Sequence, residues 1–126
     1  MKNVLKVNPE SAQAAYNIGV MLAERKPEES MKYIKMAVKL APAEPKYQYS
    51  LAFYLLKAEK KTQAVSILEK LVDNHPDYAD SWFLLGSIYE ETDKEKAKKL
   101  YEQALKYEGL NDEARQAITQ KLTEFQ

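Results

Sequence analysis

Prolines and a glycine interrupt the chain at a regular interval, and that interval limits the fold more than any other feature. Pro9, Pro42 and Pro76 are followed by Gly109, at separations of 33, 34 and 33 residues. Small side chains recur at the same interval, at Gly19, Ala52, Gly86 and Thr119. Larger apolar side chains recur one residue earlier, at Ile18, Leu51, Leu85 and Ile118. Such a period is typical of stacked helical pairs, in which each pair covers the apolar face of the next.

Within each period, apolar residues at helical spacing predict two helices. The first helices are expected at 10–24, 44–58 and 78–91, and the second helices at 28–40, 62–74 and 94–107. A last segment, 111–125, repeats a first helix without its partner. Pro27, Thr62 and Asp93 mark helix starts, because proline fits a first turn and a side-chain oxygen caps free backbone N–H groups. The chain is therefore expected to be all-α.

One domain is expected over residues 1–126, because the repeats would stack in sequence on a continuous core. Its parts are a tail of a preceding repeat or an N-terminal turn at 1–9, repeats at 10–42, 43–76 and 77–109, and a capping helix at 110–126. The last segment is polar, as the exposed end of such an array must be for solubility.

Composition excludes several other classes of fold and function. The 126 residues include only three glycines and five prolines, too few turns for an all-β sandwich or barrel. The absence of cysteine removes disulfides and thiolate metal sites. Nineteen basic residues balance nineteen acidic ones, so the basic excess usual for nucleic-acid binding is missing. No apolar run reaches the length of about 18 residues that spans a bilayer. Neither nucleic acid nor membrane is an expected partner.

No group of residues in the sequence indicates catalysis. The single histidine, His75, lies in a turn beside Asp73, where capping is more common than catalysis. Asp73, Asp77 and Asp80 lack the spacing, the glycine and the terminal glutamate of a calcium-binding EF-hand loop. The glycines are isolated, so no phosphate-binding loop is present. We expect no enzymatic activity, no cofactor and no metal.

Residues 82–89, Trp-Phe-Leu-Leu-Gly-Ser-Ile-Tyr, resemble the first-helix motif W-x2-L-G-x2-Y of the tetratricopeptide repeat family. Ala97, Tyr101 and Ala104 follow at the family's second-helix spacing. The earlier repeats match at the small and apolar positions, with other residues in place of the tryptophan. The resemblance covers essentially the whole chain. It implies a right-handed superhelical α-solenoid of antiparallel helix pairs, a concave groove lined by the first helices, and protein–protein interaction as the function.

The regular spacing of small and large residues also predicts how paired helices meet. Gly19 and Gly86 carry no side chain, so the second helix of each pair can approach closely there. A bulky substitution at Gly86 is expected to overpack this seam. The seam is expected to be filled by Ile18, Leu22, Leu51, Leu55, Leu85 and Tyr89.

The helix face opposite the seam is the predicted binding surface. It includes aromatic residues at successive levels of the stack, and aromatic side chains are common anchors at interfaces. The predicted peptide-binding groove consists of Tyr16, Val20, Lys46, Tyr49, Phe53, Asp80, Phe83 and Ser87. A peptide or helix of a partner protein is the favoured ligand. The alternative is that the aromatic residues pack against one another or against a neighbouring domain.

Charge is distributed unevenly along the chain. Residues 1–41 carry a net charge of +3, residues 42–70 +2, residues 71–93 −6 and residues 94–126 +1. A partner in the groove would therefore gain from a basic group near Asp80. Solubility alone is the alternative explanation of the acidic segment.

The beginning of the chain resembles the end of a second helix, because residues 4–9 repeat the pattern of residues 37–42. The expectation is a fragment of a longer protein whose uncovered N-terminal helices, within residues 1–24, form a homodimer. Residues 1–9 lack the apolar run of a secretory signal, which predicts a cytoplasmic location if residue 1 is the natural N-terminus. For a fragment of a longer protein, this feature does not bear on location.

Two functions remain open on the sequence alone. The first is a non-catalytic module that holds a peptide or helix of a partner protein in a groove. The second is a structural spacer or self-association region of a larger polypeptide. Binding to an extended peptide would favour the first, and association only with itself or with its parent chain would favour the second.

Overall fold

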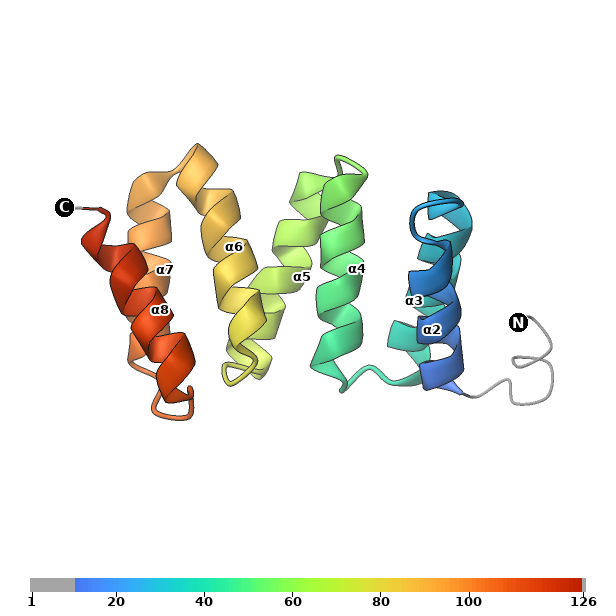
Figure 1. Ribbon diagram of the computed structural model, residues 1–126, viewed down its shortest axis with the longest axis horizontal. Coiled ribbons are helices and arrows are strands. Elements are labelled where there is room, and N and C mark those ends of the chain that lie inside the picture. Colours follow the sequence, from blue (N-terminus) through green and yellow to red (C-terminus); the bar gives the residue numbers. More distant parts are fainter. Residues whose placement is uncertain (1–10, 126) are drawn as a thin grey trace. The chain divides into compact units, whose positions relative to one another are not determined.

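The computed structural model describes residues 11–125, which form seven α-helices and no strand (Figure 1). The helices are α2 (Ala12–Leu22), α3 (Pro27–Leu40), α4 (Pro45–Lys57), α5 (Lys61–Asn74), α6 (Ala79–Thr92), α7 (Lys94–Leu105) and α8 (Asp112–Thr123). Every observed helix begins and ends within two residues of its predicted bounds. The expectation of an all-α helical repeat is confirmed. The tail predicted at residues 1–9 lies outside the described residues.

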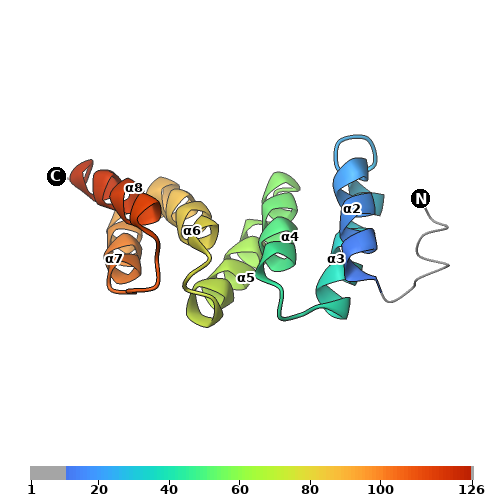
Figure 2. The same cartoon turned by 60° about the horizontal axis from the view of Figure 1, so that its bottom comes forward.

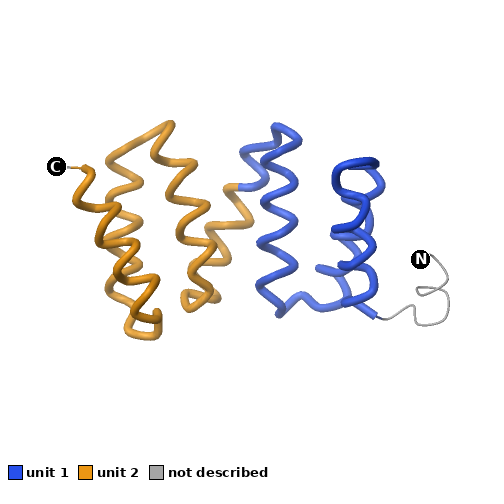
Figure 3. Tube along the Cα trace, viewed as in Figure 1, with its two compact units in different colours: residues 1–64 blue, residues 65–126 orange. Residues whose placement is uncertain are grey.

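The chain divides into two compact units, residues 1–64 (unit 1) and residues 65–126 (unit 2), and the division falls within α5 (Figure 3). In unit 1, α2 and α3 pack side by side and α3 also contacts α4 (Figure 1, Figure 2). In unit 2, α6 packs against α7, and α7 against α8. Each unit therefore has helix-on-helix packing of its own.

Local sequence explains where the helices begin. The Ser11 hydroxyl accepts a hydrogen bond from the Ala14 N–H at 3.0 Å, and the Asn111 side chain accepts one from the Ala114 N–H at 2.8 Å. Asp93 caps α7 in the same way. Each bond satisfies a backbone donor that the helix leaves free, which stabilises the helix by about 1 kcal/mol.

One part of the unit 1 core consists of two alanines and the ring of a tyrosine. Ala15 of α2 and Ala37 of α3 are fully buried, and the ring of Tyr47 from α4 packs against both. The Tyr47 hydroxyl reaches the edge of this core and donates to the Gln13 side chain at 3.3 Å. The ring therefore fills a space that two alanines leave open.

The core of unit 2 contains both aromatic and large aliphatic side chains. Trp82 and Leu85 of α6, Tyr101 of α7 and Ile118 of α8 are all buried. The indole N–H of Trp82 donates to the Pro76 carbonyl at 2.8 Å, so its one polar group is satisfied. The seam residues Leu55 and Leu85 are buried as predicted.

Gly86 is required by the close approach of α6 to α7. A methyl group placed on its Cα would overlap the ring of Tyr101, which is fully buried. We expect Gly86→Ala to lower the free energy of unfolding by about 1–3 kcal/mol, the cost of overpacking. Urea unfolding followed by circular dichroism measures this loss. An unchanged midpoint would show that the helices separate freely at this position.

Ser81 of α6 and Ser30 of α3 are both buried, but only one of them has a hydrogen bond. The Ser30 hydroxyl donates to the Gly19 carbonyl at 2.6 Å. The Ser81 hydroxyl has no partner within the described residues. A buried polar group without a partner is costly, and its replacement by a methyl group removes that cost. We expect Ser81→Ala to raise the free energy of unfolding and Ser30→Ala to lower it, each by about 1 kcal/mol, in the same denaturation assay.

Candidate protein-binding surface

Tyr16, the first residue of the predicted groove, is held in place by contacts within unit 1. Its ring lies 4.8 Å from the ring of Tyr47, measured between centroids, and its hydroxyl is 3.0 Å from the Ser50 hydroxyl. The Lys46 ammonium lies over the same ring, 5.0 Å from its centroid. Two predicted groove residues, Tyr16 and Lys46, are therefore in contact. The ring of the buried Tyr47 packs against the Tyr16 ring.

Val20 and Phe53, also predicted for the groove, line one cleft in unit 1. The cleft has a volume of about 960 Å³ and is lined by the α2–α3 turn, by α3 and by the second half of α4. The Phe53 ring meets the Tyr54 ring edge-on at 5.5 Å, and the Lys57 ammonium lies 5.1 Å from the Phe53 centroid. The volume is within the range of small-ligand and peptide-anchor pockets.

The walls of this cleft contain residues that sequence reasoning did not select. Its apolar side chains are Val20, Met21, Met31, Phe53 and Tyr54. Its basic side chains are Arg25, Lys32, Lys35, Lys57 and Lys60, and its acidic ones are Glu24 and Glu28. We call this site, defined by these twelve residues, the basic cleft. The i, i+3 spacing of Lys32 and Lys35 and of Lys57 and Lys60 is a signal that could have indicated it.

The remaining groove residues lie in both units. Tyr49 of unit 1 is half-buried. In unit 2, Asp80 is exposed, Phe83 is half-buried, and Ser87 is exposed with its hydroxyl donating to the Leu84 carbonyl at 2.8 Å. All three unit 2 residues are on α6, the first helix of its repeat.

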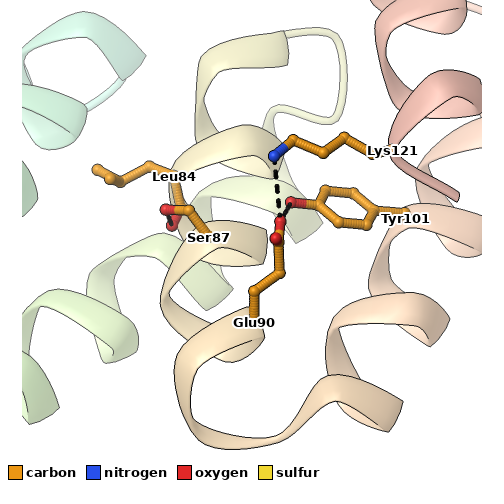
Figure 4. A network of polar contacts seen from close by, with 5 residues as sticks. All are labelled: Leu84, Ser87, Glu90, Tyr101 and Lys121. Carbon is orange, nitrogen blue, oxygen red and sulfur yellow. Dashed lines mark hydrogen bonds and ion pairs between the residues drawn. The ribbon is translucent and has the colours of Figure 1, made fainter. Parts of the chain in front are cut away.

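Glu90 connects α6, α7 and α8 of unit 2 beside this surface (Figure 4). Its carboxylate accepts a hydrogen bond from the Tyr101 hydroxyl of α7 at 2.6 Å and lies 3.5 Å from the Lys121 ammonium of α8. Arg115 of α8 also donates to the Leu105 carbonyl near the end of α7 at 3.0 Å. These polar contacts hold the predicted capping helix against its neighbours.

Two buried tyrosines of unit 2 donate to carboxylates, and both are harder to ionise than an exposed tyrosine. Burial, followed by the hydrogen bond to Glu69 at 2.5 Å, raises the pKa of the Tyr89 hydroxyl well above its usual value. Burial, followed by the hydrogen bond to Glu90, raises the pKa of the Tyr101 hydroxyl in the same way. A neutral hydroxyl is required for either bond, because an ionised one has no proton to donate.

These raised pKa values predict that the chain loses stability in alkaline solution. Below the unfolded tyrosine pKa of about 10, both hydroxyls are neutral in both states, and their bonds contribute fully. Above it, the unfolded chain releases protons that the folded chain still holds, so the free energy of unfolding falls as pH rises. Urea unfolding at several pH values on either side of 10 measures the slope. The double variant Tyr89→Phe, Tyr101→Phe should show a smaller slope, and an equal slope would contradict the assignment.

The two units carry opposite net charges. Residues 1–64 contain eleven basic and six acidic residues, a net charge of +5, and residues 65–126 contain eight basic and thirteen acidic residues, a net charge of −5. The basic cleft thus lies in a unit that is positive as a whole. A charged ligand would discriminate between the two units.

Among residues 11–125, no three histidine, aspartate or glutamate side chains gather closely enough to hold a metal ion. His75 follows α5 directly, where its backbone N–H donates to the Leu71 carbonyl at 2.7 Å. In the same described part of the chain, no helix has the length and apolar character needed to cross a membrane.

The helical pairs, the small residues at their seams and the partly exposed first-helix surface define a helical-repeat protein. Two sequence models described as tetratricopeptide repeat match the chain, one over residues 1–45 and 49–94 and the other over residues 80–109. The chain belongs to the tetratricopeptide repeat family. Members of this family serve as protein-interaction and scaffold modules, which is the general class of function assigned here.

Solved structures with the same fold support this assignment. The crystal structure of MamA superposes with a TM-score of 0.71 at 22% identity, over 98% of this chain and 76% of that chain. TTC0263, a thermophilic tetratricopeptide repeat protein of Thermus thermophilus, superposes with a TM-score of 0.58 at 27% identity, over 76% of this chain and 53% of that one. Both likenesses concern the fold.

One curated relative is much longer than this chain. Protein O-mannosyl-transferase Tmtc3 of Drosophila melanogaster is 27% identical over 111 residues. The match covers 86% of this chain but 12% of that protein. The chain therefore corresponds to a small, repeat-containing part of the relative.

Proposed function

We propose that the chain is a non-catalytic module that binds a peptide or helix of a partner protein on its first helices. In unit 1 the surface comprises the predicted groove residues Tyr16, Val20, Lys46, Tyr49 and Phe53. In unit 2 it comprises Asp80, Phe83 and Ser87. The observation that carries the proposal is the exposure of apolar side chains on a first helix, the part of the repeat expected to line the binding groove. Val20 of α2 is 41% exposed, and Met21 beside it is 63% exposed. Both side chains line the basic cleft. Exposed apolar clusters of this kind mark interaction sites.

The absence of catalysis is part of this proposal. The transferase in the name of the Drosophila relative belongs to a protein of which this chain matches 12%. The tetratricopeptide repeat match over most of the chain supports a non-catalytic role, because this repeat fold is generally non-catalytic.

A peptide array screened with the labelled chain tests the proposal. Peptides that bind are then titrated against Tyr49→Ala and Phe83→Ala, which truncate one groove residue in each unit. Met36→Ala is the matched control, because Met36 is exposed and apolar but lies on α3, outside the predicted groove. We propose that each groove variant weakens binding while the control does not. An array without any binding peptide would reject the proposal.

A second candidate function is a spacer or self-association region of a larger polypeptide. The opposite net charges of units 1 and 2 favour it, because unit 1 of one copy attracts unit 2 of another. Sedimentation analysis at low and high salt distinguishes self-association from peptide binding. Oligomers that dissociate as salt rises, without any bound peptide in the array, would support self-association between the oppositely charged units. A homodimer through the N-terminal helices would rest on apolar contact and would persist at high salt.

A further inference from the structure

The basic cleft of unit 1 has two chemical sides that one kind of ligand would satisfy together. Its apolar side includes Met21, Met31 and Phe53, of which Met21 is 63% exposed. Its basic side draws Lys32 and Lys35 from α3 and Lys57 from α4, so cations stand on both walls. A ligand that packs an apolar group against the apolar side would place the groups next to it in contact with the basic side.

The charge of the cleft is strongly one-sided. Five basic side chains line it against two acidic ones, a net charge of +3. Within residues 11–125, none of the five cations forms an ion pair, so only the overall charge of Glu24 and Glu28 offsets them in the cleft. Cations held close together around a low-dielectric surface attract carboxylates more strongly than isolated surface lysines do.

A second hollow, in unit 2, does not share this character. It has a volume of about 350 Å³ and is lined by Glu69 and Asp73 as well as by Lys96 and Lys99. Its two acidic and two basic side chains balance. Of these two hollows, the cleft of unit 1 has the larger volume, the exposed apolar side chains and the excess of basic side chains.

We propose that the basic cleft binds an acidic, amphipathic segment of a partner protein. One or two large apolar side chains of the segment contact Met21, Met31 and Phe53, and aspartates or glutamates on both flanks pair with Lys32, Lys35 and Lys57. The carboxylates are side chains within the segment, so a free C-terminus is not required. This inference rests on the proposed binding function and specifies where unit 1 binds and which chemistry it selects.

Fluorescence anisotropy with three peptides tests the chemistry of the ligand. The probe is a fluorescein-labelled, C-terminally amidated peptide, Asp-Glu-Phe-Glu-Asp-Leu-Phe-Asp-Glu-Leu. In the second peptide every acid is replaced by its amide, and in the third every Phe and Leu is replaced by Ser. We expect the 126-residue chain to bind the first peptide at least about tenfold more tightly than either of the others, with affinity falling as salt rises. Equal binding of the first two peptides would overturn the proposal.

Variants of the chain test the location. Lys32→Glu combined with Lys57→Glu reverses two exposed charges of the cleft and should weaken binding by about tenfold or more. Lys39→Glu combined with Lys61→Glu is the matched control, because it changes the net charge equally at exposed positions outside the cleft. Met21→Asp should also weaken binding by placing a carboxylate on the apolar side. If the two double variants bind alike, the cleft is not the site.

The remaining outcomes separate this inference from the proposed function. If the peptide array finds ligands but none is acidic, the binding function stands and the charge preference is rejected. If the acidic peptide does not bind at several hundred micromolar, while sedimentation shows self-association that Met21→Asp abolishes, a second copy occupies the cleft and the proposal of an acidic partner is wrong. Thermal unfolding of each variant confirms that it folds before its affinity is compared.

Discussion

Leu55→Ala and Leu85→Ala should each lower the free energy of unfolding by about 2–5 kcal/mol. Both leucines are almost completely buried, Leu55 on α4 of unit 1 and Leu85 on α6 of unit 2. Truncation removes apolar contact and leaves a space that the surrounding helices fill only in part. Urea unfolding followed by circular dichroism measures the loss.

Phe53→Ala provides the contrast within one helix, because Phe53 shares α4 with Leu55 but is only half-buried. We expect it to cost about 1 kcal/mol of stability, from the lost contacts with Tyr54 and Lys57. If Phe53 is a binding anchor, the same variant should weaken partner binding by about 1–3 kcal/mol. A loss of stability as large as that of Leu55→Ala would place Phe53 in the core and remove it from the groove.

Trp82→Ala should be the most damaging single substitution in unit 2, with a loss of about 3–5 kcal/mol. The side chain is buried, and its N–H bond to the Pro76 carbonyl connects α6 to the turn before it. Because Trp82 is the only tryptophan, unfolding is followed by circular dichroism instead of intrinsic fluorescence.

Trp82→Phe is the control for this experiment. It keeps an aromatic ring in the core but removes the donor, so the Pro76 carbonyl loses its partner. If Trp82→Phe lowers the free energy of unfolding much less than Trp82→Ala does, most of the loss in the alanine variant comes from packing. Equal costs would mean that the hydrogen bond, and not ring volume, holds the turn.

The fold could be predicted from sequence because its determinants are periodic and local. The interval of 33 to 34 residues set the number of helices, and prolines and capping side chains set their ends to within two residues. Gly86 shows how one position carries this information, since its missing side chain is what admits the Tyr101 ring. Such features repeat in each unit and need no knowledge of distant contacts.

The candidate site was less predictable, because its shape depends on side chains from several helices. Helical spacing placed Val20 and Phe53 on one face, but it did not indicate the cavity that Met31 and Lys35 of α3 complete. The sequence pattern predicted neither a core position nor a groove position for Tyr47. It occupies a repeat position where unit 2 has Ser81, and only the packed structure shows that its ring fills the space beside Ala15.

The separation of core from cleft rim has a consequence for how this protein can change. Lys32, Lys35, Lys57 and Lys60 are exposed, and each can be replaced without opening a cavity. The alanines and Tyr47 that hold α2, α3 and α4 together are not part of the rim. Ligand preference is thus free to evolve, or to be redesigned, by exchanging a few charges on a scaffold whose folding does not depend on them.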